Sequence, residues 1–261
     1  ENPITYIVVP STVKSIGENA FRGSNITKIT LSEGLESIGN SAFRELDITD
    51  IKIPDSVKTI GDYAFYGVGV SEFELSDNVQ SIGKYAFANN ENLTAVKLSE
   101  SLTEIPEGAF YGTGIATVTI PEGVNTIGKK AFGNCLYLVT VNLNNGRVDI
   151  YYDETNPSDN AIGFTSSGSI ANGSLTIYGA YDTQSYSYAS KAGINFSGNT
   201  EGATYSGIIP QTNSVLQNRP LQWFYYEDVK TLYIQGKGYL NGDGLYYKDG
   251  TKFDVNIDIE N

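Results

Sequence analysis

The stretch NITKITLSEGLESIGNSAF, residues 25–43, decides the fold, because the first half of the chain repeats its pattern. Within it, Ile26 is followed by apolar residues in alternation at Ile29 and Leu31, and then by the phrase Ile-Gly-x-x-Ala-Phe. Six copies of this order end at Phe21, Phe43, Phe65, Phe87, Phe110 and Phe132. One structural unit repeated six times indicates a repeat architecture such as a solenoid.

The copies recur every 22 residues with one exception. The isoleucine that opens the closing phrase falls at positions 16, 38, 60, 82, 105 and 127, so one interval is 23 residues long. That interval contains Asn89–Asn92, where other copies have a Gly-containing turn, and the register then resumes. A unit of this length cannot bury a core alone, so we expect the units to stack, each short strand beside the preceding one in a parallel sheet.

The Gly-x-x-Ala-Phe phrase predicts the wall opposite this sheet. We expect it to form a short helical turn that directs its Ala and Phe side chains into the core. The six Phe residues would then stack as one buried column. Cys135 stands three residues after Phe132, the position that Asn90 holds after Phe87, and we expect its thiol to be buried in a turn.

The repeated phrases resemble a known family. VPSTVKSIGENAF (residues 9–21), IPDSVKTIGDYAF (53–65) and IPEGVNTIGKKAF (120–132) are similar to the BspA-type leucine-rich repeat of secreted and surface-anchored proteins from anaerobic gut and mouth bacteria. The resemblance covers residues 4 to about 143 and departs at Ile105-Pro106, where Pro replaces Gly. It implies a leucine-rich repeat solenoid, with a parallel β-sheet on one face and short helical turns on the other.

The rest of the chain predicts a cap, a linker and a small module. LTIYGAYDTQSYSYASKAGINF, residues 175–196, resembles the closing segment of this family, a last strand followed by a short helix. We therefore expect a repeat domain over residues 1–200, with its cap at about 144–200. Residues 201–220, rich in Gly, Ser, Thr and Asn, predict a linker. Residues 221–261 predict a small all-β module with a hairpin turn at Asp249-Gly250.

The composition excludes several classes of function. The formal net charge is -13, so nucleic acid and anionic membrane surfaces, which require a basic face, are not expected partners. No window holds the roughly 18 apolar residues that a membrane-spanning helix needs. The chain has no His, the usual general base and a common metal ligand, and one Cys, which allows no internal disulfide. We expect neither a cofactor nor catalysis.

The outward-facing positions of the predicted strands form the candidate interaction surface, because solenoids commonly bind ligands on this wall. Stacking would place Lys28 beside Asp50, and Glu74 between Lys52 and Lys97. We expect these charges to pair with one another rather than to form a selective site, although exposed pairs add little stability. The candidate residues are Tyr6, Lys28, Asp50, Lys52, Glu72, Glu74 and Lys97 on the strands and Tyr151, Tyr152 and Tyr181 in the cap.

Tyrosines and carboxylates suggest further sites in the second half of the chain, which holds 13 of the 19 Tyr residues after position 150. The cap tyrosines could stack on sugar rings or a protein partner, or they could simply cover a small core. Asp153, Glu154 and Asp159 share one loop and could bind calcium, but they lack the order of a specific calcium motif. Paired carboxylates could also serve a glycosidase, although no pattern places two of them across a cleft.

The resemblance implies an interaction protein located outside the cell or at the bacterial cell surface. Its partners would be host matrix proteins, other bacteria or surface glycans, and its roles adhesion and colonisation. The alternative is a structural spacer that displays a carbohydrate-binding module. In either case the expected ligand is an extracellular protein or glycan, without nucleic acid binding or membrane insertion.

Overall fold

The repeats form a stack of parallel coils in the computed structural model, which describes residues 4–143, 148–179 and 183–198 together with five short strands between residues 205 and 253. The chain divides into two compact units, residues 1–198 and 199–261. In the described residues no helix combines the length and the apolar character that crossing a bilayer requires.

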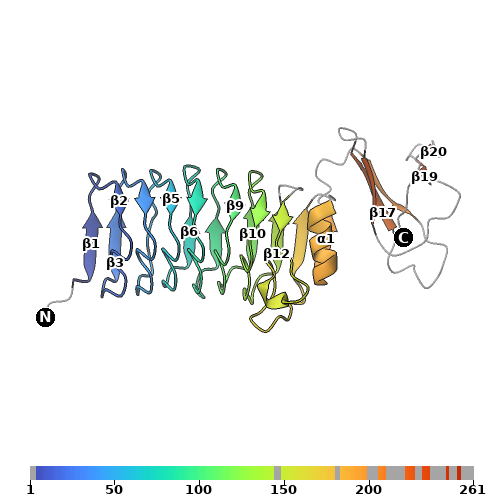
Figure 1. Cartoon of the computed structure of the whole chain (residues 1–261). Helices are drawn as coiled ribbons and strands as arrows, with labels where there is room; N and C mark the ends of the chain where they lie inside the picture. Colours follow the sequence, from blue (N-terminus) through green and yellow to red (C-terminus); the bar gives the residue numbers. More distant parts are fainter. Residues whose placement is uncertain are drawn as a thin grey trace. The chain divides into compact units, whose positions relative to one another are not determined.

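One wall of the stack is built from strands that pair in parallel register (Figure 1). Along each strand exposed and buried residues alternate, as in β3, where Ile29 and Leu31 are buried and Lys28 and Thr30 are exposed. This wall is called the first sheet. Its strands are β1 (Tyr6–Val9), β3 (Lys28–Leu31), β6 (Glu72–Glu74), β8 (Ala95–Lys97), β10 (Thr117–Ile120), β12 (Thr140–Leu143), β14 (Thr176–Gly179) and β15 (Asn195–Gly198).

The first sheet is interrupted in two places, at the third coil and between β8 and β10. No strand is assigned in the third coil, at residues 50–53, so β3 and β6 have no strand between them. The described strands therefore pair in separate groups, β1 with β3, β6 with β8, and β10, β12, β14 and β15 together. The 22-residue period predicts one continuous ladder of paired strands, whereas in the structure this pairing is broken between the three groups.

A second wall carries two-residue strands that the periodicity does not predict. Each ends at a buried isoleucine, which in all but the last strand opens the closing phrase, and its preceding residue lies toward the outside. The strands are β2 (Ser15–Ile16), β4 (Ser37–Ile38), β5 (Thr59–Ile60), β7 (Ser81–Ile82), β9 (Glu104–Ile105), β11 (Thr126–Ile127) and β13 (Asp149–Ile150). They also pair in parallel, in two groups, one of β2, β4, β5 and β7 and one of β9, β11 and β13.

The Gly-x-x-Ala-Phe phrase forms hydrogen-bonded turns next to these short strands. In the second copy, the N–H of Ala42 donates to the carbonyl of Gly39 and the N–H of Arg44 to that of Ser41, both at 3.2 Å. These bonds span three residues, as in a tight helical turn, but Ser41 has a φ of 55° and so prevents a regular helix. The phrase thus makes a turn and does not continue into a helix.

The predicted column of Phe rings fills the core. Rings from successive coils are 5.1 to 5.5 Å apart between centroids, and their planes differ by at most 17°. The five inner members, Phe43, Phe65, Phe87, Phe110 and Phe132, have no exposed surface. Phe21, in the first coil, is only partly buried.

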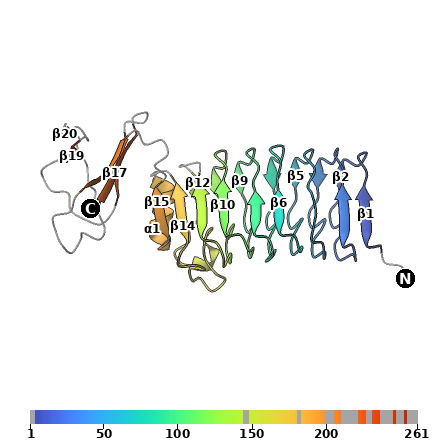
Figure 2. The same ribbon diagram turned by 180° about the vertical axis from the view of Figure 1, so that it is seen from behind.

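The cap of the first unit contains the short 3₁₀ helix η1 (Pro157–Asp159) and the helix α1 (Thr183–Ala192), which lies against β13, β14 and β15 (Figure 2). The apolar residues at helical spacing, Tyr188, Ala189 and Ala192, are buried. The Tyr188 hydroxyl donates to the carbonyl of Ile162 at 2.8 Å and accepts from its N–H at 2.9 Å. This pair of bonds joins α1 to the extended last coil.

The second unit contains antiparallel strands. Strand β17 (Leu221–Tyr226) pairs with β16 (Tyr205–Ile209) and with β18 (Thr231–Gln235), and β19 (Leu245–Tyr246) pairs with β20 (Lys252–Phe253). The predicted linker at 201–220 includes β16, which belongs to this sheet. The hairpin turn predicted at Asp249-Gly250 lies outside the described residues.

Candidate interaction surface

Parallel pairing places the outward residues of the first sheet in columns. Tyr6 is in register with Lys28, and Glu72 and Glu74 are in register with Ala95 and Lys97. The side chains are exposed because they point away from the core in an alternating strand. The strand candidates from the sequence thus share one face, which is called the outer face.

The predicted ion-pair ladder on the outer face is largely absent. The Glu74 carboxylate and the Lys97 ammonium are 3.0 Å apart, and the pKa of Lys97 is raised by this hydrogen bond and charge. Among the ion pairs of the described residues, however, none joins Lys28 to Asp50 or Lys52 to Glu74. The prediction of those two pairs is wrong, and each of them involves a residue of the third coil, where no strand is assigned at residues 50–53.

Lys28 interacts with a ring instead of a carboxylate. Its ammonium lies 5.6 Å from the centroid of the Tyr6 ring, a cation–π geometry across the β1–β3 pair. Asp50, Lys52 and Glu72 are exposed and make no ion pair in the described part of the chain. The charges near the interruption in the sheet therefore remain available to a ligand.

A hollow of about 920 Å³ lies on the outer face where the sheet is interrupted. It spans the third to fifth coils, and its lining includes four carboxylates and two ammonium groups, those of Asp50, Asp55, Glu72, Glu74, Lys52 and Lys97. We call it the outer-face trough. The carboxylates exceed the lysines, so the trough has a net negative charge.

The cap candidates lie around a separate hollow of about 500 Å³, lined by Tyr151, Tyr152, Asp153, Glu154 and Lys191. Tyr151 is 38% exposed, whereas the Tyr152 hydroxyl donates to the carbonyl of Lys191 at 3.1 Å. The ring of Tyr152 also packs edge-to-face on Tyr188, 6.0 Å between centroids. Tyr152 therefore supports the cap, and Tyr151 is the more exposed ring. Tyr181 lies outside the described residues.

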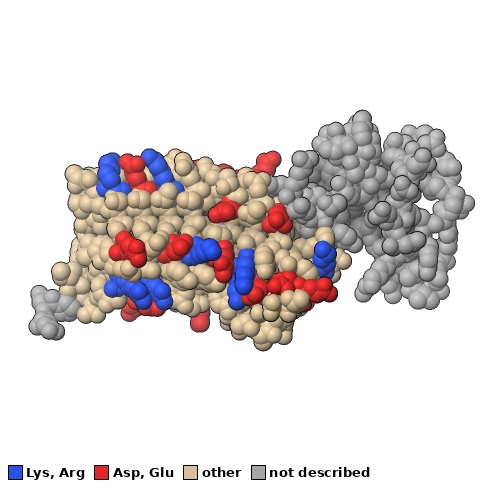
Figure 3. Space-filling model, in the orientation of Figure 1, with Lys and Arg blue, Asp and Glu red and all other residues tan. Residues whose placement is uncertain are grey.

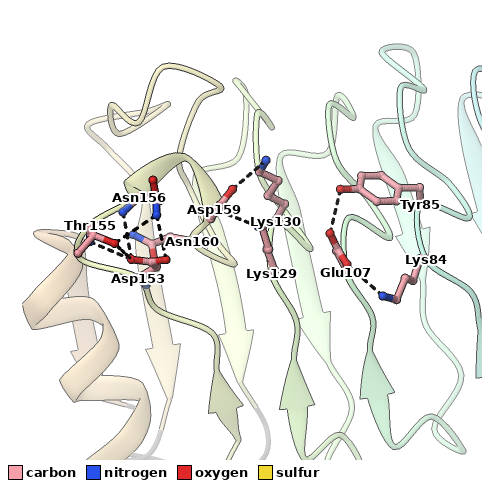
Figure 4. A network of polar contacts seen from close by, with 10 residues as sticks. All are labelled: Lys84, Tyr85, Glu107, Lys129, Lys130, Asp153, Thr155, Asn156, Asp159 and Asn160. Carbon is pink, nitrogen blue, oxygen red and sulfur yellow. Dashed lines mark hydrogen bonds and ion pairs between the residues drawn. The ribbon is translucent and has the colours of Figure 1, made fainter.

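The acidic loop beside this hollow uses its carboxylates internally (Figure 4). Asp153 accepts hydrogen bonds from the backbone N–H and hydroxyl of Thr155 and from the N–H of Asn156, and these bonds lower its pKa to about 2. Asp159 lies 2.8 Å from the Lys129 ammonium and 2.9 Å from that of Lys130. No cluster of three metal-ligating side chains occurs in the part of the chain that the structure describes. This geometry offers the calcium alternative no support.

A cluster of aromatic and charged side chains on the Gly-x-x-Ala-Phe turns was not predicted from the sequence. The Tyr63 ring stacks on Tyr85 at 5.2 Å and 9°, and the Arg44 guanidinium lies 5.2 Å from Tyr63 and 4.8 Å from Tyr66. The Tyr85 hydroxyl lies 3.3 Å from Glu107, and burial followed by this carboxylate raises the pKa of Tyr85 to about 12. In the sequence, this cluster is indicated by Tyr63 and Tyr85, which occupy the same variable position of two successive closing phrases. Because Tyr63 and Tyr85 face each other, the cluster stabilises the turns.

The buried thiol is confirmed as a turn residue. Cys135 donates to the carbonyl of Phe110 at 3.1 Å and lies 3.3 Å from the Thr113 hydroxyl. Burial raises the pKa of the thiol, so it is not activated as a nucleophile. The equivalent Asn90 donates through Nδ2 to the carbonyls of Phe65 and Phe87, at 2.8 and 2.7 Å. Both residues satisfy carbonyls inside the turn.

The surface charge of the first unit is mixed on the face that Figure 3 shows. Acidic and basic side chains lie next to one another there, and no broad area of a single sign covers it (Figure 3). A ligand recognised by charge would therefore have to match a local arrangement, such as that of the outer-face trough.

Comparison with known proteins identifies the repeat. A sequence model described as the BspA type leucine rich repeat region matches residues 1–69 and 58–153, with six copies. No curated protein sequence matches the chain.

Several solved structures are similar. A leucine-rich repeat protein from Bacteroides ovatus is 23% identical, with a TM-score of 0.41, and the match covers 67% of this chain and 55% of that one. A leucine rich cell surface protein from Faecalibacterium prausnitzii is 18% identical, with a TM-score of 0.31 and coverage of 62% and 78%. The pneumococcal vaccine antigen PcpA is 18% identical, with a TM-score of 0.43 and coverage of 76% and 42%. The chain spans about half the length of the Bacteroides ovatus protein.

Proposed function

Because the chain belongs to the BspA-type leucine-rich repeat family, we propose that it is a non-catalytic interaction protein that binds an extracellular protein ligand in the outer-face trough. Repeat solenoids of this kind generally act as binding scaffolds rather than as enzymes. A location at the bacterial surface and a role in adhesion to host matrix proteins are part of the proposal.

The observation that carries the proposal is the set of charged side chains at the interrupted sheet that make no ion pair with any residue the structure describes. Asp50, Lys52 and Glu72 line the trough, and all three are exposed. A charged side chain in an intramolecular ion pair must break that pair before it can contact a ligand, whereas these three side chains can contact a ligand directly. Charges arranged in this way contribute mainly to the rate and the specificity of association.

The lining of the trough favours a protein segment over a sugar. Its aromatic residue, Phe73, is only 2% exposed and so offers no free ring face for stacking on a pyranose. The lining carries both signs of charge, and its carboxylates outnumber its lysines. A basic segment of a protein is the ligand that this arrangement fits.

Binding to an immobilised panel of extracellular-matrix proteins tests the proposal. The double variant Asp50→Ala/Glu72→Ala should lose about tenfold in affinity or more, which corresponds to about 1.4 kcal/mol. The matched control Glu100→Ala/Glu122→Ala removes the same charge from exposed positions outside the trough and should bind as the native protein does. Equal losses for both variants would show a non-specific charge effect and contradict the proposal.

A glycan array tests the alternative of a spacer that displays a carbohydrate-binding module. Under our proposal a truncation to residues 1–200 retains the binding of a matrix protein, because the trough lies in the first unit. Glycan binding that disappears with residues 201–261, combined with no matrix-protein binding, would assign recognition to the second unit and leave the repeats as a stalk.

A further inference from the structure

The last coil of the repeat carries an inserted loop. The N–H of Tyr151 donates to the carbonyl of Ile127 at 2.9 Å, as the glycine at this position does in earlier coils. The N–H of Lys130 donates to the carbonyl of Asp159 at 3.0 Å, which is the bond that the residue after that glycine accepts elsewhere. Residues 152–158 are therefore added between two positions that keep the repeat register. Insertions into single repeats commonly form the binding loops of repeat proteins.

The residue before this loop departs from the packing rule of the stack. Tyr151 stands where five of the six earlier coils have glycine. At Gly39, Gly61 and Gly83 an added Cβ atom would lie 2.3 to 2.7 Å from an atom of the preceding coil, so those positions exclude a side chain. The stacking of coils does not require a tyrosine in this position, and Tyr151 is 38% exposed.

The hollow beside Tyr151, which we call the cap hollow, has the size of a small-molecule site. Its volume of about 500 Å³ lies within the range of about 300–1,000 Å³ that is usual for such sites. The bond from the Tyr152 hydroxyl to the carbonyl of Lys191 joins the inserted loop to α1, and the Tyr152 ring packs against Tyr188. The two sides of the hollow are thus held together before a ligand arrives, which lowers the cost of binding.

The carboxylate of Asp153 is oriented by the loop and keeps one oxygen for a ligand. Its Oδ1 accepts three bonds at 2.7 to 3.0 Å, from the N–H and hydroxyl of Thr155 and the N–H of Asn156 (Figure 4). In the described residues, Oδ2 receives a single long contact, 3.5 Å from Nδ2 of Asn156. Because the pKa of Asp153 is lowered to about 2, Oδ2 is a charged acceptor at any ordinary pH.

Glu154 and Lys191 complete the polar lining of the cap hollow. Both line the same space, yet neither forms an ion pair with any residue that the structure describes. The Lys191 ammonium lies instead 5.9 Å from the centroid of the Tyr152 ring. The hollow thus combines an exposed aromatic ring with two carboxylate acceptors and one ammonium donor.

We propose that the cap hollow binds a neutral pyranose sugar stacked on the ring of Tyr151. A pyranose has a face of C–H groups, which packs on the negative face of an aromatic ring. Its hydroxyls donate to the carboxylates of Asp153 and Glu154 and accept from the ammonium of Lys191. Two carboxylates against one ammonium give the lining a net negative charge, which disfavours acidic sugars. The outer-face trough lacks such a ring, so the two sites take different ligands.

Saturation-transfer NMR on the full chain tests the proposal, with the methyl glycosides of glucose, galactose and mannose as probes. At least one probe should bind in the millimolar range, with the strongest transfer to the C–H protons of one sugar face. Tyr151→Ala should weaken binding by about tenfold or more, because the stacking surface is lost. Tyr178→Ala is the matched control, since it removes a tyrosine that is 40% exposed on β14, outside the hollow.

A conservative variant separates the loss of stacking from damage to the fold. Tyr151→Phe keeps the ring and should bind the probe as the native protein does. A native protein that transfers saturation to none of the three probes overturns the proposal. An equal effect of Tyr151→Ala and Tyr178→Ala, including no effect of either, also overturns it, because sugar binding would then not depend on the cap hollow.

A charge change tests the contact with Glu154. Glu154→Lys converts the lining from two carboxylates and one ammonium, net -1, to one carboxylate and two ammonium groups, net +1. Methyl glucuronide, an acidic sugar, should then bind about tenfold more tightly than it binds the native protein. Glu122→Lys makes the same change at an exposed position outside the hollow and should leave this affinity unchanged. No gain for Glu154→Lys would overturn the placement of the sugar beside Glu154.

Discussion

At the scale of the residue, the fourth position of each closing phrase Ile-Gly-x-x-Ala-Phe has a left-handed backbone. Asn19, Ser41, Tyr63, Tyr85 and Lys130 have φ between 53° and 57° there, and the remaining copy has Gly108 at 63°. A glycine is required at position 108 because the Tyr85 ring of the preceding coil occupies the space of a side chain. A Cβ atom at position 108 would lie 2.2 Å from the ring of Tyr85, too close for any side chain.

The substitution Gly108→Ala is therefore expected to destabilise the protein by about 1–3 kcal/mol through overpacking, in addition to the cost of a left-handed alanine. Gly23→Ala is the matched control, because Gly23 has a φ of 65° and no atom within 4 Å of an added Cβ. Urea unfolding of both variants measures the difference. Adding Tyr85→Ala to Gly108→Ala should recover part of the loss, and no recovery would mean that the ring is not the obstacle.

A second prediction concerns the carboxylate of Asp153. Its pKa is lowered from 3.8 to about 2, mainly by the hydrogen bond from the Thr155 hydroxyl. A lowered pKa in the folded state stabilises the fold above the unfolded pKa, and this contribution is lost as the pH falls from about 4 to about 2.

Thermal unfolding across this range should show Asp153→Asn to be less stable than the native protein near neutral pH. The gap should close as the pH falls from about 4 to about 2, because the native carboxyl then also becomes protonated. Glu154→Gln changes a neighbouring carboxylate that accepts none of the hydrogen bonds among the described loop residues, and it should leave the gap to the native protein small at every pH. A pH-independent gap for Asp153→Asn would show that the loop does not depend on the charge.

At the scale of the element, the Phe column runs through the core of the repeated coils. Each ring from Phe43 to Phe110 contacts the rings before and after it, at 5.1 to 5.5 Å between centroids. Phe73 of β6 adds edge contacts to Phe65 and Phe87, at 5.1 and 4.8 Å. The middle of the column is thus packed on several sides, and its first member is not.

Truncation of a middle ring, Phe87→Ala, should cost about 3–5 kcal/mol, because it leaves a cavity that rigid neighbours cannot fill. Phe21→Ala removes the same atoms from the partly buried end of the column and should cost clearly less. The free energy of unfolding from chemical denaturation gives both values. Equal costs would show that the column does not act as one packed element.

At the scale of the whole molecule, the sequence predicts what every coil has in common. The period, the parallel stacking, the buried Phe column and the inserted residue at a turn all follow from Ile, Gly, Ala and Phe at fixed spacing. These positions must match because each coil buries its core only against its neighbours. In the longer turn, Asn90 donates two hydrogen bonds to carbonyls inside the turn.

The sequence does not predict features that belong to a single coil. Equal spacing suggests that Lys52 and Glu74 meet, but no strand is assigned at residues 50–53 and Glu74 pairs with Lys97 instead. The stacking of Arg44, Tyr63 and Tyr85 depends on side-chain directions set by a left-handed residue, which the period cannot convey. The outer-face trough lies at the third coil, where no strand is assigned. The sequence therefore predicts the outer face as the binding surface but does not locate the trough on it.

The buried residues are nearly the same in every repeated coil, and this affects how the gene can change. A coil that is removed or duplicated as a unit leaves two ends that fit one another, because the Ile, Ala and Phe positions on either side are the same. Recombination between repeated gene segments can therefore lengthen or shorten the protein without new core mutations. The area of wall offered to a ligand is then set by the copy number of a gene segment, a property that can change within one generation.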